Sequence, residues 1–309
     1  MDKALFVGPL DRVLLLRTLP MLQGLGPVQL AAIAQHAQER FLPRTTTLSL
    51  ADGVNEAIHL IVDGQLEVRR QDGAPRTFQP GDAVGFTEML SRSNPRLEVR
   101  ASVDTTTLEL DWDAQLDVCE EHFPVVMQYV SYIAATLVEK LKQQPIATMD
   151  PVPLIESQGF EAQLNLIERV LVLSRSGAFS SGCLDALSEL AHHVTEIGWR
   201  AGEQIWARDD RADHFLVLAS GSVRCHPPAG GSFVCHAGNV LGIHAALSQR
   251  PRWHNTVTEQ EIIALRVDIE PFIDILEDHF DLALDFLALL ATDLMALEVA
   301  APENGKENS

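Results

Sequence analysis

The chain repeats itself at a constant spacing of 157 residues, since residue 12 matches residue 169. The apolar run Arg12-Val13-Leu14-Leu15-Leu16 returns as Arg169-Val170-Leu171-Val172-Leu173. The same spacing joins pairs of glycines, aspartates and His-Phe dipeptides: Gly64 and Gly221, Gly81 and Gly238, Gly85 and Gly242, Asp111 and Asp268, His122-Phe123 and His279-Phe280. A spacing that stays constant through helices, strands and turns requires elements of equal length in the same order. The sequence therefore predicts two copies of one domain in tandem.

The length agrees with this organisation. A chain of 309 residues with 46% hydrophobic residues has enough apolar material for two separate cores. We expect the first domain at residues 11–142 and the second at residues 161–300. A proline-punctuated linker is expected at 143–160, and a disordered polar tail at 301–309.

The charge balance is strongly acidic and restricts the partners. There are 23 Lys and Arg against 43 Asp and Glu, which gives a net charge of -20. Nucleic-acid binding normally needs a basic face, so we expect no nucleic-acid partner. After Leu297 the remaining residues leave no room for a DNA-binding helix-turn-helix.

The compartment is predicted from cysteines and hydropathy. The 4 cysteines are too few and too scattered for a disulfide framework, and no signal peptide is recognisable, so a cytoplasmic location is expected. The longest apolar stretch, near 282–300, is interrupted by Asp285, Asp293 and Glu298. We therefore expect no membrane span.

Within each copy the pattern runs from helices to strands and back to helices. Apolar residues before Phe41 recur at three- and four-residue steps, which predicts short amphipathic helices. Alternation around Asp63-Gly64, and again around Ser220-Gly221, predicts an antiparallel hairpin in each copy. The predicted fold class is α+β: two tandem antiparallel β-rolls of the jelly-roll type, each flanked by α-helices.

The last helix of each copy carries an apolar seam. Two interpretations remain open: the roll of the same copy covers the seam, or the seam binds a partner protein or a second copy of the chain as a homodimer. In the second copy the residues of this seam are Leu287, Leu290, Leu294 and Leu297.

These features together resemble the cyclic-nucleotide-binding domain, which occurs in the bacterial catabolite activator and, in tandem, in regulatory subunits of protein kinase A. The resemblance rests on Leu19-Pro20-Met21-Leu22, on the segment Ala57 to Val68, and on a phosphate-cassette pattern present in both copies. In the first copy Pro80-Gly81-Asp82-Ala83-Val84-Gly85 leads to Asn94-Pro95-Arg96. In the second copy Ala237-Gly238-Asn239-Val240-Leu241-Gly242 leads to Arg250-Pro251-Arg252.

The resemblance implies a specific role for each part of the cassette. A glycine lets the backbone approach the ligand, an arginine neutralises the cyclic phosphate, and a glutamate directly after the glycine binds the ribose hydroxyl. Here that glutamate is replaced by Phe86 in one copy and Ile243 in the other. Leaving the hydroxyl unpaired costs about 1 to 3 kcal/mol, so a weak site or another anionic ligand is expected.

The candidate ligand-binding residues are those of the two cassettes. Arg96 and Arg252 either bind a ligand phosphate or form pairs within the protein, and Trp253 either stacks on a purine or packs in the core. No cofactor is expected beyond a cyclic nucleotide ligand. The full candidate set is Gly85, Thr87, Glu88, Arg96, Gly242 and Arg252.

Metal and enzyme chemistry are not favoured by the sequence. Cys225-His226 and Cys235-His236 contain zinc-ligand residue types, but adjacent residues on a strand point to opposite faces, so the cysteines are expected to fill the core. No nucleophile elbow, phosphate-binding glycine loop, His-Glu-x-x-His or CxxC pattern is present. We therefore expect no catalytic residues, no metal site and no enzymatic activity.

Two classes of function remain open for this acidic regulatory or signalling chain. In the first, one or both rolls sense a cyclic nucleotide or a related anionic ligand and relay its binding to a protein partner. In the second, the rolls are degenerate and the protein is a protein-protein scaffold or adaptor without nucleotide binding. The more polar cassette of the first copy makes that copy the preferred binding site.

Overall fold

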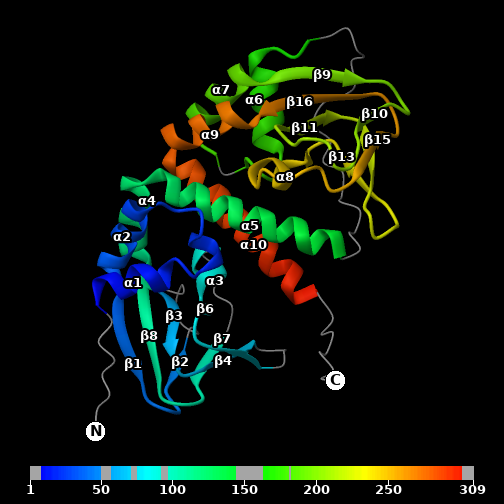
Figure 1. Cartoon of the computed structure of the whole chain (residues 1–309). Coiled ribbons are helices and arrows are strands. Elements are labelled where there is room, and N and C mark those ends of the chain that lie inside the picture. Colours follow the sequence, from blue (N-terminus) through cyan, green and yellow to red (C-terminus); the bar gives the residue numbers. More distant parts are fainter. Residues whose placement is uncertain are drawn as a thin grey trace. The chain divides into compact units, whose positions relative to one another are not determined.

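The computed structural model describes residues 8–49, 57–70, 75–91, 97–143, 163–180 and 182–300. Nearly all of the predicted linker, and all of the predicted tail, lie outside these ranges. Both copies contain helices, then strands with one short helix among them, then two helices (Figure 1). The helices of the first copy are α1 (Pro9–Leu16), the short 3-10 helix η1 (Pro20–Leu22), α2 (Pro27–His36), α3 (Phe86–Leu90), α4 (Trp112–Glu121) and α5 (Phe123–Gln143). Those of the second copy are α6 (Leu166–Arg175), α7 (Leu184–His193), α8 (Ile243–Leu247), α9 (Ile269–Asp278) and α10 (Phe280–Ala300).

Each copy folds its strands into two four-stranded antiparallel sheets. In the first copy the orders are β1-β8-β3-β6 and β2-β7-β4-β5, and in the second they are β9-β16-β11-β14 and β10-β15-β12-β13. The strands of the first copy are β1 (Gln38–Leu42), β2 (Thr47–Ser49), β3 (Ala57–Asp63), β4 (Leu66–Arg70), β5 (Arg76–Phe78), β6 (Ala83–Val84), β7 (Leu97–Ala101) and β8 (Thr105–Asp111). Those of the second are β9 (Thr195–Trp199), β10 (Gln204–Trp206), β11 (His214–Ser220), β12 (Ser222–His226), β13 (Phe233–His236), β14 (Val240–Leu241), β15 (Asn255–Thr258) and β16 (Ile262–Asp268).

The duplication predicted from the sequence is present in the structure. Adding 157 to the bounds of α2, β3, β8, α4 and α5 gives the bounds of α7, β11, β16, α9 and α10. The order of strands in the sheets is also the same in both copies. The predicted α+β fold with two tandem antiparallel rolls is therefore confirmed.

The predicted hairpins at Gly64 and Gly221 are wrong. β3 pairs with β6 and β8, whereas β4 pairs with β5 and β7, so the chain crosses from one sheet to the other at Gly64. The crossing packs closely on the start of β8, because a Cβ at Gly64 would lie 2.5 Å from the Asp104 carbonyl oxygen. The Gln65 amide donates to Thr105 Oγ1 at 3.0 Å and holds the corner in place. β11 and β12 likewise belong to different sheets.

The interior of each roll lies between its two sheets. In the first roll, apolar side chains from both sheets form one cluster, into which Leu48 and Phe78 also pack: Leu42, Ile61, Leu66, Val68, Val84, Val99 and Ala101. β3 is buried from Ala57 to Ile61, whichever face of the strand each side chain occupies. The alternation of apolar residues in its sequence therefore does not mark a solvent-facing side.

The chain forms two compact units, and each unit consists of segments that are separated in the sequence. The first unit extends to Tyr132 and includes Leu290–Ala296, from the last helix of the chain. The second unit contains Ile133–Leu289, and therefore the second half of α5. Within the first unit, Ser91 Oγ donates to Met295 Sδ at 3.1 Å. This segment of α10 therefore belongs to the first unit, although it follows the strands of the second copy in the sequence.

The apolar seam of α10 is not a free surface. Leu287, Leu290 and Leu294 are buried, and Leu297 is half-buried. The prediction that these four leucines bind a partner is corrected, because their side chains are already packed. No helix in the described part of the chain is both long enough and apolar enough to cross a membrane.

Candidate functional site

The two cassettes begin with a glycine in the left-handed conformation. Gly85 (φ 95°) precedes α3, and Gly242 (φ 81°) precedes α8. Phe86 and Ile243, which stand where the resemblance implies a glutamate, are both buried. Phe86 packs edge-on against Tyr129 of α5, with ring centroids 5.2 Å apart. Both positions following the glycine are therefore part of the core.

The remaining candidates of the first copy are only partly described. Thr87 and Glu88 lie on α3 and are half-buried. Arg96 lies outside the described residues. The structure therefore brings Gly85, Thr87 and Glu88 together at the start of α3.

Arg252 is directed into the protein and bonded there. It is 2% exposed, and its guanidinium donates from Nη1 to the Gly242 carbonyl (3.1 Å) and from Nη2 to the His214 carbonyl (2.6 Å). Its Cζ lies 4.0 Å from the centroid of the Trp206 ring, which is cation-π geometry. Burial lowers the pKa of Arg252 to about 10, partly opposed by the nearby Asp213 and Asp210 carboxylates. The group therefore stays charged at neutral pH.

Gly242 is required by this arrangement. A Cβ at this position would collide with Arg252 Nη1 and would lie 2.9 Å from the Trp206 ring. In the family's cassette the glycine makes room for a ligand, whereas here the room is taken by two side chains of the same roll.

An aromatic cluster that includes Trp206 lies beside the arginine; it is called the aromatic shell below. Trp206, Phe233, Trp253 and His254 are all buried. The His254 ring lies 4.5 Å from that of Trp253, 5.6 Å from that of Phe233 and 6.0 Å from that of Trp206, measured between centroids. Burial lowers the pKa of His254 to about 4, so it is neutral at pH 7 and adds no second charge beside Arg252. The core-packing interpretation of Trp253 holds.

The two predicted arginines do not occupy equivalent positions in the sequence repeat. Val68 pairs with Val99, and Cys225 pairs with Thr256, so the offset of 157 continues through this sheet. At that offset Arg96 corresponds to Trp253, and Arg252 corresponds to Pro95. The match between the two arginines therefore requires a shift of one residue.

The shell residues are particular to the second copy. At the same offset Trp206 corresponds to Ser49, Phe233 to Arg76, and His254 to Leu97. Sequence reasoning missed the Trp206 ring and the His214 carbonyl as contacts of Arg252. It also missed Phe233 and His254 as members of the aromatic shell. The signal available was the concentration of aromatic residues in the cassette region of only one copy.

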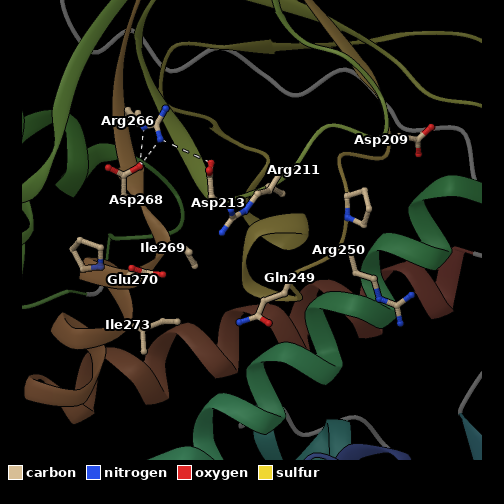
Figure 2. A pocket seen from close by; sticks show the side chains of 13 residues that line it. Asp209, Arg211, Asp213, Gln249, Arg250, Arg266, Asp268, Ile269, Glu270 and Ile273 are labelled. Carbon is tan, nitrogen blue, oxygen red and sulfur yellow. Dashed lines mark hydrogen bonds and ion pairs between the residues drawn. The ribbon is translucent and has the colours of Figure 1, made fainter.

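A cavity of about 860 Å³ lies in the second unit, outside the arginine and its shell (Figure 2). Its charged residues are largely paired: Arg266 Nη2 lies 2.7 Å from Asp268 Oδ1 and 3.9 Å from Asp213 Oδ1. Arg250 lies 3.9 Å from Glu139. The cavity is lined by Asp209, Arg211, Ala212, Asp213, Gln249, Arg250, Pro251, Arg266, Asp268, Ile269, Glu270, Pro271 and Ile273. These groups offer hydrogen bonds and charges but no paired nucleophile and base.

The cysteine pair of the second copy is part of the core. Cys225 and Cys235 are both buried on neighbouring strands, whereas His226 is exposed. Cys225 Sγ lies 3.7 Å from Thr256 Oγ1. Nowhere in the described ranges do three or more His, Cys, Asp or Glu side chains converge as a metal site would require.

Comparison with known proteins gives a family match for part of the second copy. Residues 196–279 match the model of the cyclic nucleotide-binding domain family. No curated protein matches the chain. Among solved structures, the regulatory domain of Toxoplasma gondii PKA with cAMP is 16% identical, with 91% of this chain and 97% of that chain covered and a TM-score of 0.34.

Two further solved structures match, one over most of the chain and one over less than half of it. The regulatory subunit of a cAMP-independent protein kinase A from Trypanosoma brucei is 12% identical over 90% of this chain and 91% of that chain, with a TM-score of 0.35. The N-terminal domain of a transcriptional regulator from Streptomyces coelicolor is 20% identical over 43% of this chain and 99% of that chain, with a TM-score of 0.38. Residues 196–279 of the second copy therefore match the cyclic nucleotide-binding domain family, and the first copy has the same order of strands as the second.

Proposed function

We propose that this chain is a non-catalytic regulatory protein in which only the first roll senses a ligand. The ligand is a cyclic nucleotide or a related anionic molecule, and its binding is relayed to a protein partner. The second roll is filled by its own side chains and has a constant structure. We also propose that the protein is cytoplasmic and uses no cofactor.

The position of Arg252 is the main observation that supports this proposal. A phosphate-binding arginine must present free N-H groups to the ligand, but two Arg252 nitrogens already donate to Gly242 and His214, and Trp206 covers the guanidinium. A nucleotide would have to displace an indole ring and break two charge-assisted hydrogen bonds, each contributing about 1.5 to 3 kcal/mol.

The first roll differs from the second roll in residues that favour ligand binding. Its glycine has the same left-handed conformation, and polar Thr87 and Glu88 follow on α3. The positions that correspond to the aromatic shell hold Ser49, Arg76 and Leu97. We assign the phosphate to Arg96 from the family resemblance. With Phe86 in place of the ribose-binding glutamate, the expected affinity is about ten to a hundred times below that of a complete site.

Calorimetric titration of the full chain tests this proposal. Cyclic AMP, cyclic GMP and cyclic dinucleotides are titrated separately, and at least one should bind at a single site per chain. Arg96→Ala should abolish binding, because it removes the cation that neutralises the phosphate. Arg100→Ala is the matched control: this arginine is four residues later in the sequence, lies on β7 and is exposed, and its loss should leave binding unchanged.

Two results would contradict the proposal in different ways. Two sites per chain, one of them lost in a correctly folded Arg252→Ala protein, would show that the second roll also binds. No heat with any nucleotide would remove the sensing role and leave the scaffold or adaptor function.

A further inference from the structure

Exposed apolar side chains gather on the first two helices of each copy. Among the described residues, nine large apolar side chains are exposed, and seven of them lie on α1, α2, α6 or α7. Single exposed apolar residues need no explanation, but a cluster of them marks an interaction surface. The seven are Leu10, Leu14, Val28, Leu166, Ile167, Leu171 and Leu184.

Two exposed residues of the first helix recur at matching positions in the two copies. Leu10 is 71% exposed and its counterpart Ile167 is 72% exposed, while Leu14 is 54% and its counterpart Leu171 is 44% exposed. In each helix the two residues are four positions apart, so they lie on one face. Val28 stands at the start of α2, and Leu184 at the start of α7. We call Leu10, Leu14 and Val28 the first apolar surface, and Ile167, Leu171 and Leu184 the second.

Both surfaces are built on rigid supports. Arg12 Nη1 donates to the Ala37 carbonyl at 2.6 Å, and its counterpart Arg169 donates from Nη1 to the Val194 carbonyl at 3.3 Å. Each bond ties the first helix of a copy to the end of the second. Leu16 of α1 and Val172 of α6 are fully buried. The exposed residues are therefore held on helices whose opposite faces are packed.

The acidic charge of the whole chain favours a basic partner. Asp11 on α1 and Asp185 on α7 are exposed. Glu189 on α7 is paired with His279, and Arg17 at the end of α1 is exposed. The chain carries a net charge of -20, which opposes association between two copies and attracts a cationic molecule.

We propose that each apolar surface docks one amphipathic helix of a partner protein, apolar on one face and rich in Lys or Arg along its edges. One chain would then hold two such helices. An apolar pair at positions i and i+4 beside a second helix matches the i, i+3, i+4 pattern of an amphipathic helix. The inference rests on the part of the proposed function that calls for a protein partner, and it is independent of ligand sensing.

A designed peptide provides the test. The probe is a Leu-Lys amphipathic helix of about 18 residues, or five turns, labelled for fluorescence anisotropy and titrated into the full chain. A second peptide of the same composition with scrambled order controls for charge alone. We expect two binding sites per chain for the amphipathic peptide and at least about tenfold weaker binding for the scrambled one.

Matched substitutions assign the sites. Leu10→Ser with Leu14→Ser should leave one site, Ile167→Ser with Leu171→Ser should also leave one, and all four together should leave none. Phe41→Ser with Val103→Ser changes the two other exposed apolar residues and should leave both sites intact. Because all these side chains are exposed, the thermal unfolding midpoint should change little in any variant.

Several outcomes would overturn the inference. Sites that persist after all four substitutions, or equal binding of the scrambled peptide, would show that the surfaces do not select a helix. A dimer in light scattering that dissociates in the surface variants, without peptide binding, would identify a second copy as the occupant. Binding to anionic vesicles instead of peptide would identify a lipid surface. Two peptide sites in a chain that binds no nucleotide would leave this inference standing while ligand sensing fails.

Discussion

The buried Arg252 of the second roll is bonded within the protein. It is charged, and it contacts the Trp206 ring and two backbone carbonyls, with the Asp213 and Asp210 carboxylates nearby. A guanidinium can satisfy carbonyls in two directions while its flat face rests on an indole, which an ammonium group cannot do. Its Nε atom has no hydrogen-bond partner among the described residues. The network is therefore held by two of the three nitrogens and by the ring.

Replacing this arginine should destabilise the second copy. Arg252→Met removes two charge-assisted hydrogen bonds and the cation-π contact with Trp206, so the free energy of unfolding should fall by about 2 to 4 kcal/mol. Urea denaturation followed by tryptophan fluorescence measures the change. Arg224→Met is the control: Arg224 is 41% exposed and pairs with Glu259 at the surface, so its loss should cost less than about 1 kcal/mol. Equal losses in both variants would contradict the structural role of Arg252.

His254 should make the stability of the second copy depend on pH. Burial lowers its pKa from 6.5 to about 4, so the unfolded chain binds a proton more readily than the folded chain between these values. The contribution is complete above pH 6.5 and is lost as the pH falls toward 4, amounting to about 2 kcal/mol between pH 7 and pH 5. Comparing urea denaturation at both pH values for His254→Gln and the natural chain isolates this effect. The exposed His226→Gln should behave like the natural chain. An unchanged pH dependence in His254→Gln would show that His254 is not the group responsible.

At the scale of elements, the turn before α8 depends on its lack of a side chain. Gly242 and Gly202 share a φ of 81°, but a Cβ at Gly242 meets Arg252 and Trp206, whereas a Cβ at Gly202 meets nothing within 4 Å. Gly202→Ala should therefore cost about 1 kcal/mol for the backbone alone. Gly242→Ala should cost about 2 kcal/mol more, because the arginine and the ring must move. Thermal denaturation of the pair gives the difference directly, and equal midpoints would mean that the contact is unimportant.

The strands show where local sequence patterns stop being informative. The constant offset predicted the two rolls and their flanking helices, because it constrains every element of a copy at once. The same residues suggested a hairpin at Gly64, since alternation and a turn are compatible with either a hairpin or a step between sheets. Only the pairing of β3 with β8 and of β4 with β7 distinguishes these two structures.

The candidate site was predictable in outline only. Gly85 and Gly242 were recognisable from the cassette pattern, and both are left-handed in the structure. The direction of the Arg252 side chain was not, because its contacts come from β10, β11 and the turn before α8, which are distant in sequence. The apolar seam of α10 was visible in the sequence, but its burial depends on the tertiary fold.

At the scale of the whole chain, the last helix is shared between the two compact units. Leu290–Ala296 belongs to the first unit, although it follows the second roll in sequence. The first unit therefore contains residues 179 positions beyond its last strand, since β8 ends at Asp111 and this segment begins at Leu290. The two copies are repeated in sequence but are not self-contained in structure.

Substitutions in α10 should therefore affect the two units separately. Leu294→Ser places a polar group in a buried site of the first unit and should cost about 3 kcal/mol there. Hydrogen exchange should then speed up in peptides from residues 8–132. Leu284→Ser, in the same helix but in the second unit, should instead speed up exchange in peptides from residues 182–289. Faster exchange confined to 182–289 in both variants would contradict this division.

Under the proposed function, the second roll has no empty form, because its own tryptophan and arginine lie against each other where a ligand would bind. Its outer surface would then stay the same at any ligand concentration, since no competitor can displace side chains that are covalently part of the chain. In a tandem protein this gives one half a fixed state. A partner that contacts both halves would then register a change in the other half against an unchanging reference.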